Sequence, residues 1–116
     1  MIDSRQMAFL SHVRALARVK GNSVFKLNET DISVVCEIAK AHPRGIPFRE
    51  ICDLVSERER TPIFRSLQRM QESGVLSRVL YNEPGTNRKY HVYTLGPNAE
   101  SQVSFWADTF DAAAGI

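Results

Sequence analysis

The sequence predicts a mainly α-helical protein with one small β-hairpin, an α+β fold. Apolar residues recur at the three- and four-residue spacing of an amphipathic helix in five segments. Between the fourth and fifth segments, two runs at 75–83 and 88–95 are rich in β-branched and aromatic residues, and a Pro-Gly-Thr-Asn turn joins them. The 116 residues, 43% hydrophobic and 24% charged, are typical of one globular domain (1–116).

The first predicted helix covers residues 2 to about 19. Its apolar residues fall on one arc of the helix, which is the pattern of an amphipathic helix with one buried face. Outside that arc lie three arginines, Arg5, Arg14 and Arg18. A Gly-Asn-Ser segment at 21–23 is expected to end this helix.

The second helix is expected to begin after Asn28, whose side chain can cap the unpaired N–H groups of the first turn. Glu29 and Asp31 add negative charge at that positive helix end. The helix should end near Ala41, because the residue before Pro43 is disfavoured in a helical conformation. Its predicted buried face consists of Ile32, Val35, Cys36 and Ala39.

A very short strand at Ile46 and a third helix are expected next. Pro47 suits the first turn of a helix, where its missing N–H costs little. This helix should end near residue 56, before a charged turn at 57–60. Its predicted apolar face consists of Phe48, Ile51, Cys52 and Val55.

The fourth helix is predicted from Pro62 to about residue 73, with Thr61 as its cap. Ile63, Leu67 and Met70 form its apolar face, and Gly74 suits the left-handed conformation that closes a helix. A fifth helix should follow the Gly-Pro-Asn break at 96–98. Its apolar residues are Ala99, Val103, Trp106, Phe110 and Ala113.

The net charge of +2, from 15 basic and 13 acidic residues, conceals a segregated distribution. Residues 1–28 carry +4 and residues 61–89 carry +3, whereas 29–43 carry −2 and 90–116 carry −3. Positive charge is therefore concentrated at the N-terminus and around the fourth helix and hairpin. Segregated charge bears on the choice of partner more than a small net charge does.

Residues 29–95 resemble a winged helix-turn-helix domain. The resemblance is carried by TPIFRSLQRMQESGVLSRVL, a helix closed by glycine, and by PGTNRKYHVYTLG, the turn and second strand of the hairpin. It implies that the fourth helix is a DNA recognition helix and the hairpin a wing. The helices at 1–20 and 97–114 are similar to those of dimeric transcriptional regulators of the PadR and MarR types, in which they would be dimerisation elements.

The predicted DNA-binding surface is the recognition-helix face opposite its apolar residues, together with the hairpin turn. A helix fits the major groove, where Arg can bind guanine and Gln can bind adenine through paired hydrogen bonds. The residues are Thr61, Pro62, Arg65, Gln68, Arg69, Asn87, Arg88 and Lys89. Phe64 departs from the family pattern, which has a small polar residue there. The alternative is a solvated surface with no specific contact.

The end helices predict a homodimer that binds a roughly palindromic site. These helices lie on either side of a complete small domain and carry large apolar side chains. Those side chains need another surface to cover them. The predicted dimerisation residues are Phe9, Val13, Leu16, Val103, Trp106 and Phe110. The alternative is that the last helix folds back onto the first within one chain.

The expected function is sequence-specific binding of double-stranded DNA as a transcriptional regulator, most simply a repressor. A plasmid-partition or replication-control protein, or a winged-helix module for protein–protein interaction, remains an alternative. A ligand-responsive sensor would need a pocket between the wing domain and the end helices, which the sequence does not reveal. No motif positions a catalytic nucleophile, cradles a phosphate or spaces zinc ligands, so no enzyme activity, metal or cofactor is expected.

A cytoplasmic location is expected, because residues 1–19 lack the apolar stretch of a signal peptide and no apolar run is long enough to span a bilayer. Cys36 and Cys52 should then be reduced. Both lie on predicted buried faces, so they are expected to pack in the core, with a redox switch as the alternative.

Overall fold

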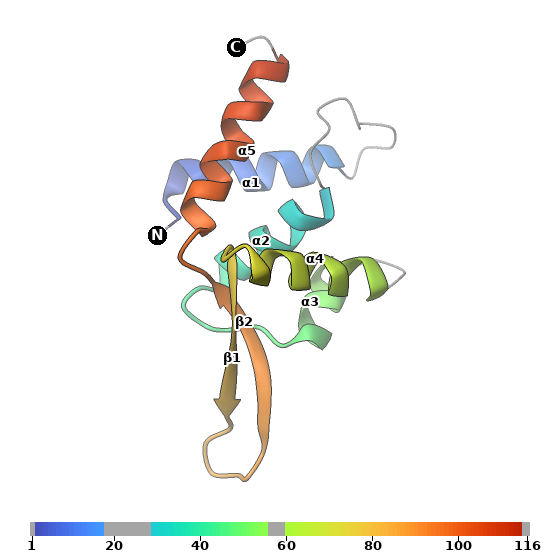
Figure 1. Ribbon diagram of the computed structural model, residues 1–116, viewed down its shortest axis with the longest axis vertical. Helices are drawn as coiled ribbons and strands as arrows, with labels where there is room; N and C mark the ends of the chain where they lie inside the picture. Colours follow the sequence, from blue (N-terminus) through green and yellow to red (C-terminus); the bar gives the residue numbers. More distant parts are fainter. Residues whose placement is uncertain (1, 18–28, 56–59, 115–116) are drawn as a thin grey trace.

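A computed structural model describes residues 2–17, 29–55 and 60–114, with only the backbone described at 15–17, 29 and 112–114. These residues form five helices and a two-stranded antiparallel sheet: α1 (Ser4–Ala17), α2 (Glu29–Ala41), α3 (Phe48–Val55), α4 (Arg60–Glu72), β1 (Leu76–Asn82), β2 (Lys89–Leu95) and α5 (Ala99–Ala114) (Figure 1). The predicted element order and α+β class are confirmed. The expected helix end at 21–23, the Asn28 cap and most of the 57–60 turn lie outside the described residues.

The start of α1 is held by a reciprocal capping arrangement. The backbone N–H of Gln6 donates to Oδ1 of Asp3 at 2.8 Å, and the backbone N–H of Asp3 donates to Oε1 of Gln6 at 3.0 Å. Two N–H groups at the helix start therefore have partners that the helix itself cannot provide. The Gln6 side chain also donates from Nε2 to the carbonyl of Glu100 at 3.2 Å, which joins α1 to α5.

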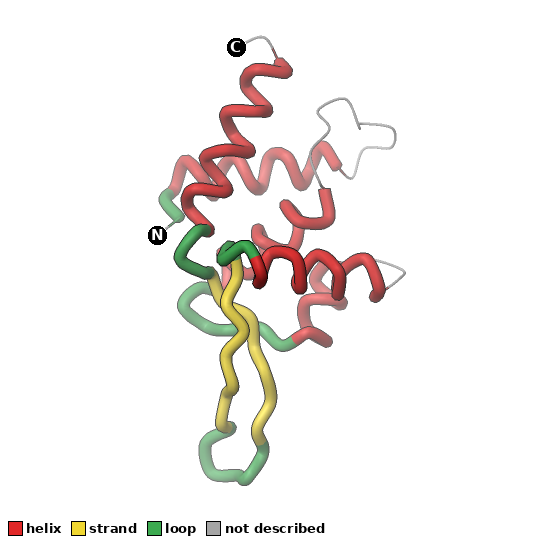
Figure 2. Tube along the Cα trace, in the orientation of Figure 1, coloured by secondary structure: helices red, strands yellow, loops and turns green. Residues whose placement is uncertain are grey.

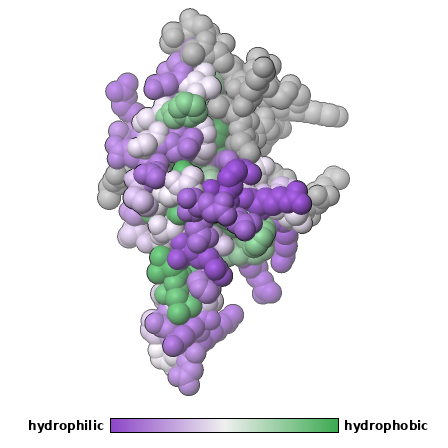
Figure 3. All heavy atoms as spheres, viewed as in Figure 1, coloured by the Kyte–Doolittle hydropathy of each residue, from purple (hydrophilic) through white to green (hydrophobic). Residues whose placement is uncertain are grey.

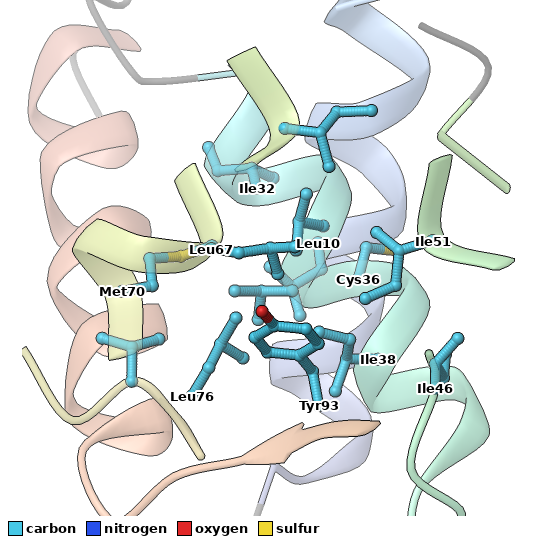
Figure 4. Packing of buried hydrophobic residues seen from close by; sticks show 14 of the residues in the cluster. Leu10, Ile32, Cys36, Ile38, Ile46, Ile51, Leu67, Met70, Leu76 and Tyr93 are labelled. Atoms are coloured by element: carbon cyan, nitrogen blue, oxygen red, sulfur yellow. The ribbon is translucent and has the colours of Figure 1, made fainter. Parts of the chain in front are cut away.

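The central element of the core is α2, against which α1, α3, α4 and β2 all pack (Figure 4). Ile32, Val35 and Cys36 are fully buried, as predicted. Val34 and Ile38 are buried as well, at 0% and 1% exposure, although the sequence pattern predicts one buried face without them. The reason is that neighbouring elements cover α2 from more than one side.

Arg14 of α1 is buried, although it lies outside the predicted apolar arc of that helix. Its guanidinium forms an ion pair with Glu37 of α2 and donates a hydrogen bond to the carbonyl of Leu54 in α3 at 2.8 Å. A buried cation needs such compensation, and here it connects three helices. Helical periodicity cannot predict this position, because the partners come from other elements.

The prediction that Thr61 caps α4 is wrong, because the helix includes Arg60 and Thr61 lies within its first turn. Pro62 is tolerated there because the first N–H groups of a helix have no acceptor within the helix. The predicted end is confirmed. Gly74 has a φ of +80°, and the backbone N–H of Val75 donates to the carbonyl of Met70 at 2.9 Å.

The hairpin of β1 and β2 projects from the helical body, and residues 83–88 form its tip (Figure 2). Its register runs from the pair Leu76 and Leu95 at the base to the pair Asn82 and Lys89 near the tip. Ile46 adds the predicted short strand, because it exchanges backbone hydrogen bonds with Tyr93 at 3.0 and 2.8 Å. We call β1, β2 and residues 83–88 the wing.

The last helix packs against the first within one chain (Figure 1). Val103 and Trp106 of α5 and Val13 of α1 belong to the buried core, at 0%, 6% and 5% exposure. Phe9 and Phe110 meet edge to face, with ring centroids 5.8 Å apart. The fold-back arrangement therefore buries Val13, Val103 and Trp106 within one chain. The Leu16 side chain lies outside the described residues.

The junction of α4, the wing and α5 depends on close backbone contact between Gly74 and Gly96. Gly96 N–H donates to the Val75 carbonyl at 2.8 Å, and Asn98 N–H donates to the Gly74 carbonyl at 2.9 Å. A Cβ on Gly96 would collide with the carbonyl oxygen of Gly74, which is backbone and cannot turn aside. Only glycine therefore fits at position 96.

Gly96→Ala is expected to lower the free energy of unfolding by about 1–3 kcal/mol, because the new methyl group forces two backbone segments apart. Urea denaturation followed by circular dichroism measures this loss. Gly85→Asn is the control, since Gly85 has a φ of +77° with open space around it and asparagine tolerates that conformation. An equal loss in both variants would contradict the role assigned to the Gly74–Gly96 contact.

Candidate nucleic-acid interface

The exposed face of α4 presents the polar residues that the sequence predicts. Ile63, Leu67 and Met70 are buried at 0–3% exposure and hold the opposite face against the core. This packing settles which side of the helix faces solvent. The predicted helix residues are all exposed: Thr61, Pro62, Arg65, Gln68 and Arg69.

Two side contacts flank this exposed face. On one flank, Nη2 of Arg69 lies 2.5 Å from Oδ1 of Asp31 in α2. On the other flank, the Phe64 ring packs edge to face against Phe48 of α3, with centroids 6.2 Å apart. Phe64 nevertheless remains 52% exposed, so an apolar surface borders the polar face. Arg65 has no hydrogen bond or ion pair within the described part of the chain.

The wing tip is a tight turn whose backbone is held by Thr86. Its hydroxyl donates to the carbonyl of Glu83 at 3.2 Å and accepts from the backbone N–H of Arg88 at 3.1 Å. The Arg88 guanidinium lies 5.6 Å from the centre of the Tyr90 ring, a cation–π arrangement. Asn87, Arg88 and Lys89 are all exposed, so the structure brings the predicted wing residues together at one end of the molecule.

Two further arginines border the predicted surface and were missed from the sequence. Arg49, exposed in the first turn of α3, shares a hollow of about 320 Å³ with Arg88 and Tyr90. Arg78 of β1 is exposed and hydrogen-bonded to Nδ1 of His91 at 3.1 Å. The only available signal for Arg49 was its position after Pro47, at a predicted helix start. Its proximity to the wing is a tertiary contact.

The surface view separates polar and apolar regions. Figure 3 shows hydrophilic side chains over the middle of the molecule, at the level of α4, and a hydrophobic patch beside the hairpin. Val79 and Leu80 of β1 are 48% and 50% exposed. The wing therefore combines charged residues near its tip with an apolar surface along its first strand.

Among residues 2–17, 29–55 and 60–114, no group of His, Cys, Asp and Glu could hold a metal ion. In the same ranges, none of the helices has the length and apolar content needed to cross a membrane.

The two cysteines are buried thiols. Cys36 is 0% and Cys52 6% exposed, and neither forms a disulfide. The prediction that both side chains lie in buried positions is confirmed. Burial raises the pKa of the Cys52 thiol, which outweighs the opposite effect of the nearby Arg60 cation.

We expect the folded protein to react with a thiol reagent such as DTNB at pH 8 about tenfold or more slower than the urea-unfolded chain, because both side chains are buried from the reagent and burial also disfavours the reactive thiolate of Cys52. Absorbance of the released thiol product gives both rates. Cys36→Ala and Cys52→Ala variants assign the reaction to one position. Rapid reaction of Cys52 in the folded protein would contradict its burial and favour the redox alternative.

The helices α2, α3 and α4, the short Ile46 strand and the wing define a winged helix-turn-helix fold, with an additional helix at each end. Solved transcriptional regulators share this fold. No protein-family model matches the sequence, and a search of curated proteins finds no match either.

Three solved structures are similar to this chain. A protein described as a possible transcriptional regulator from Methanosarcina mazei Go1 is 15% identical, with a TM-score of 0.52 over 79% of this chain and 77% of that one. Bordetella bronchiseptica BpsR, whose DNA binding is regulated by 6-hydroxynicotinic acid, is 16% identical, with a TM-score of 0.53 over 93% and 76%. The transcriptional regulator SlyA is 12% identical, with a TM-score of 0.51 over 96% and 74%. At these identities the similarity establishes the fold.

Proposed function

We propose that this protein is a cytoplasmic transcriptional regulator that binds double-stranded DNA sequence-specifically as a homodimer and acts as a repressor. The observation that carries the proposal is the exposed polar face of α4 beside a wing with a basic tip, on a fold shared with transcriptional regulators. Residues 61–89, which include both elements, carry a net charge of +3. This charge favours a polyanion as the partner.

The exposed face of α4 has the chemistry for reading bases in the major groove. The Arg65 guanidinium has no hydrogen bond or ion pair among the described residues and can donate two parallel hydrogen bonds to guanine. Gln68, one turn away in the same exposed face, can bond an adenine edge through its amide. The N-terminal end of α4, where Thr61 and Pro62 lie, favours a phosphate because the first backbone N–H groups of a helix have no acceptor within it. Pro62 itself contributes no N–H.

The wing and the first turn of α3 suit contacts to the DNA backbone. Arg88, Lys89 and Asn87 occupy the tip and its shoulder, where they are exposed. Arg49 lines the same hollow as Arg88, so a phosphate there would face two cations, with the Glu83 carboxylate also on its wall. Phosphate contacts of this kind orient a protein on the duplex without reading its sequence.

A dimer would use the other end of the molecule. Figure 1 places the wing and the C-terminal end of α5 at opposite ends. Phe105 of α5 is 63% exposed, the most exposed large apolar side chain in the described part of the chain, and Phe9 and Phe110 are only half-buried. Pairing α5 and α1 with a second copy would cover these rings and present two α4 helices to adjacent major grooves.

Binding to DNA is tested by fluorescence anisotropy with a labelled random-sequence duplex over a range of salt concentrations. Lys89→Gln is expected to reduce the magnitude of the slope of log affinity against log salt by about 0.9, because one phosphate contact is lost.

Arg65→Ala is expected to weaken the binding free energy by about 1–3 kcal/mol on a duplex selected by the wild-type protein and to relax the base preference of the protein. Arg5→Gln removes the same charge at an exposed site on α1 and should leave the salt slope and the base preference unchanged.

Affinity that does not weaken with salt, or that responds equally to Lys89→Gln and Arg5→Gln, would contradict the assigned surface. It would favour a second candidate, a module for protein–protein interaction. The observation behind that candidate is the apolar surface of Phe64, Val79 and Leu80, each about half exposed. An apolar contact with a protein should respond little to salt, since no counterions are released.

Phe105→Glu is expected to convert the dimer to a monomer, because a charge at the centre of an apolar interface cannot be solvated. Sedimentation velocity at several concentrations measures the change. Leu80→Glu is the matched control, since it places the same charge on a half-exposed apolar site of the wing. A monomer in the wild type, or an unchanged dimer in the Phe105 variant, would contradict the proposed interface.

A further inference from the structure

We propose that Asp31 is a positioning residue that assigns different roles to the two arginines of α4. It holds Arg69 at the flank of the recognition helix and out of base reading, and so leaves Arg65 as the arginine that reads bases. This inference rests on the proposed DNA-binding function. It goes beyond it by separating two arginines that the sequence pattern treats as equivalent.

One carboxylate oxygen of Asp31 anchors two residues of α4. Oδ1 accepts a hydrogen bond from the Ser66 hydroxyl and lies 2.5 Å from Nη2 of Arg69. Asp31 is 8% exposed and Ser66 1% exposed, whereas the Arg69 side chain is 54% exposed. The network therefore starts in the core and ends at the edge of the exposed face.

The positions of these residues on the helix explain the asymmetry. With about 100° between successive residues, Arg69 lies about 40° from Arg65, on the side toward the buried Ser66. Arg69 can therefore reach back to α2, while Arg65 remains near the middle of the exposed face. The Asp31 carboxylate is the partner that makes this reach favourable, because a nearly buried anion needs a cation or hydrogen-bond donors.

The ion pair changes what Arg69 can offer to DNA. Recognition of guanine by arginine needs two parallel N–H donors on one edge of the guanidinium. The bond from Nη2 of Arg69 to Asp31 uses one of its five N–H donors and holds the guanidinium toward α2, and the carboxylate offsets its positive charge. Arg69 is thus a poor base reader and a weak phosphate contact as long as Asp31 is ionised and in place.

The same network also fixes the rotation of α4 about its axis. Ser66 and Arg69 are one turn apart and share one acceptor on α2, while Phe64 packs on Phe48 of α3 at the opposite flank. Contacts on both flanks resist rolling of the helix in either direction. A fixed rotation keeps Arg65 and Gln68 aimed away from the core, as specific base contacts require.

The test compares Asp31→Asn with wild type on two DNA probes, a random-sequence duplex and a duplex selected by the wild-type protein. Asp31→Asn keeps the shape and the acceptor for Ser66 but removes the charge that retains Arg69. We expect the salt slope on the random duplex to steepen by about 0.9, as Arg69 gains one phosphate contact. The ratio of specific to non-specific affinity should fall by about three- to tenfold.

Three further variants isolate the role of Arg69. Arg69→Gln in the wild-type background should change the salt slope much less than 0.9 and leave base preference intact, unlike Arg65→Gln. Asp31→Asn combined with Arg69→Gln removes both charges, and the steeper slope should disappear in this background. Ser66→Ala removes the other hydrogen bond to Oδ1 of Asp31 without releasing Arg69. The salt slope of this variant should therefore match that of the wild type. Thermal unfolding of each variant verifies that it is folded.

The inference is overturned if Asp31→Asn steepens the slope equally with and without Arg69, because loss of a negative charge alone would then explain the effect. It is also overturned if Arg69→Gln relaxes base preference as much as Arg65→Gln does. Both results leave the DNA-binding proposal standing. A wild-type protein that shows no salt-dependent affinity for either duplex would instead contradict the proposed function, and this inference with it.

Discussion

The helix α2 is buried on several sides and organises most of the packing in the molecule. Every layer of the molecule is built on this helix, because α1, α3, α4 and β2 all pack against it. Burying each of its large aliphatic side chains contributes about 1.5–3 kcal/mol relative to exposure. The two charged residues that interrupt its buried surface, Asp31 and Glu37, each pair with an arginine from a neighbouring helix. The apolar surface of α2 supplies the driving force for folding, and the two ion pairs help to specify the positions of α1 and α4 against it.

The two ion pairs of α2 connect to different ends of the molecule. Glu37 binds Arg14 of α1, so the first helix is joined to the central helix by a buried ion pair. Asp31 binds Arg69 of α4, so the same helix also orients the proposed reading face. Removing one partner from a buried pair is costly, because it leaves a charge without compensation.

Much of the architecture follows from local patterns. The helical periodicity, the Gly74 closure and the turn at 84–87 predict the order and type of all described elements, because these signals depend on backbone geometry that neighbouring residues impose. The exposed positions of Arg65, Gln68 and the wing residues follow from the same periodicity. The prediction that Thr61 caps α4 is wrong for a local reason as well. Proline is tolerated through the first turn, so its presence marks a helix start only to within a residue or two.

The element order, the main apolar faces and the concentration of basic charge at residues 61–89 are readable from the chain alone, since each depends on the spacing of residues along it. The pairing of charged groups comes from the packing of elements that are distant in the sequence. Arg14 pairs with Glu37 and Arg69 pairs with Asp31, while Arg49 and Arg88 line the same hollow. Helix periodicity gives the direction of a side chain around its own axis. It carries no information about the partner that another helix places there.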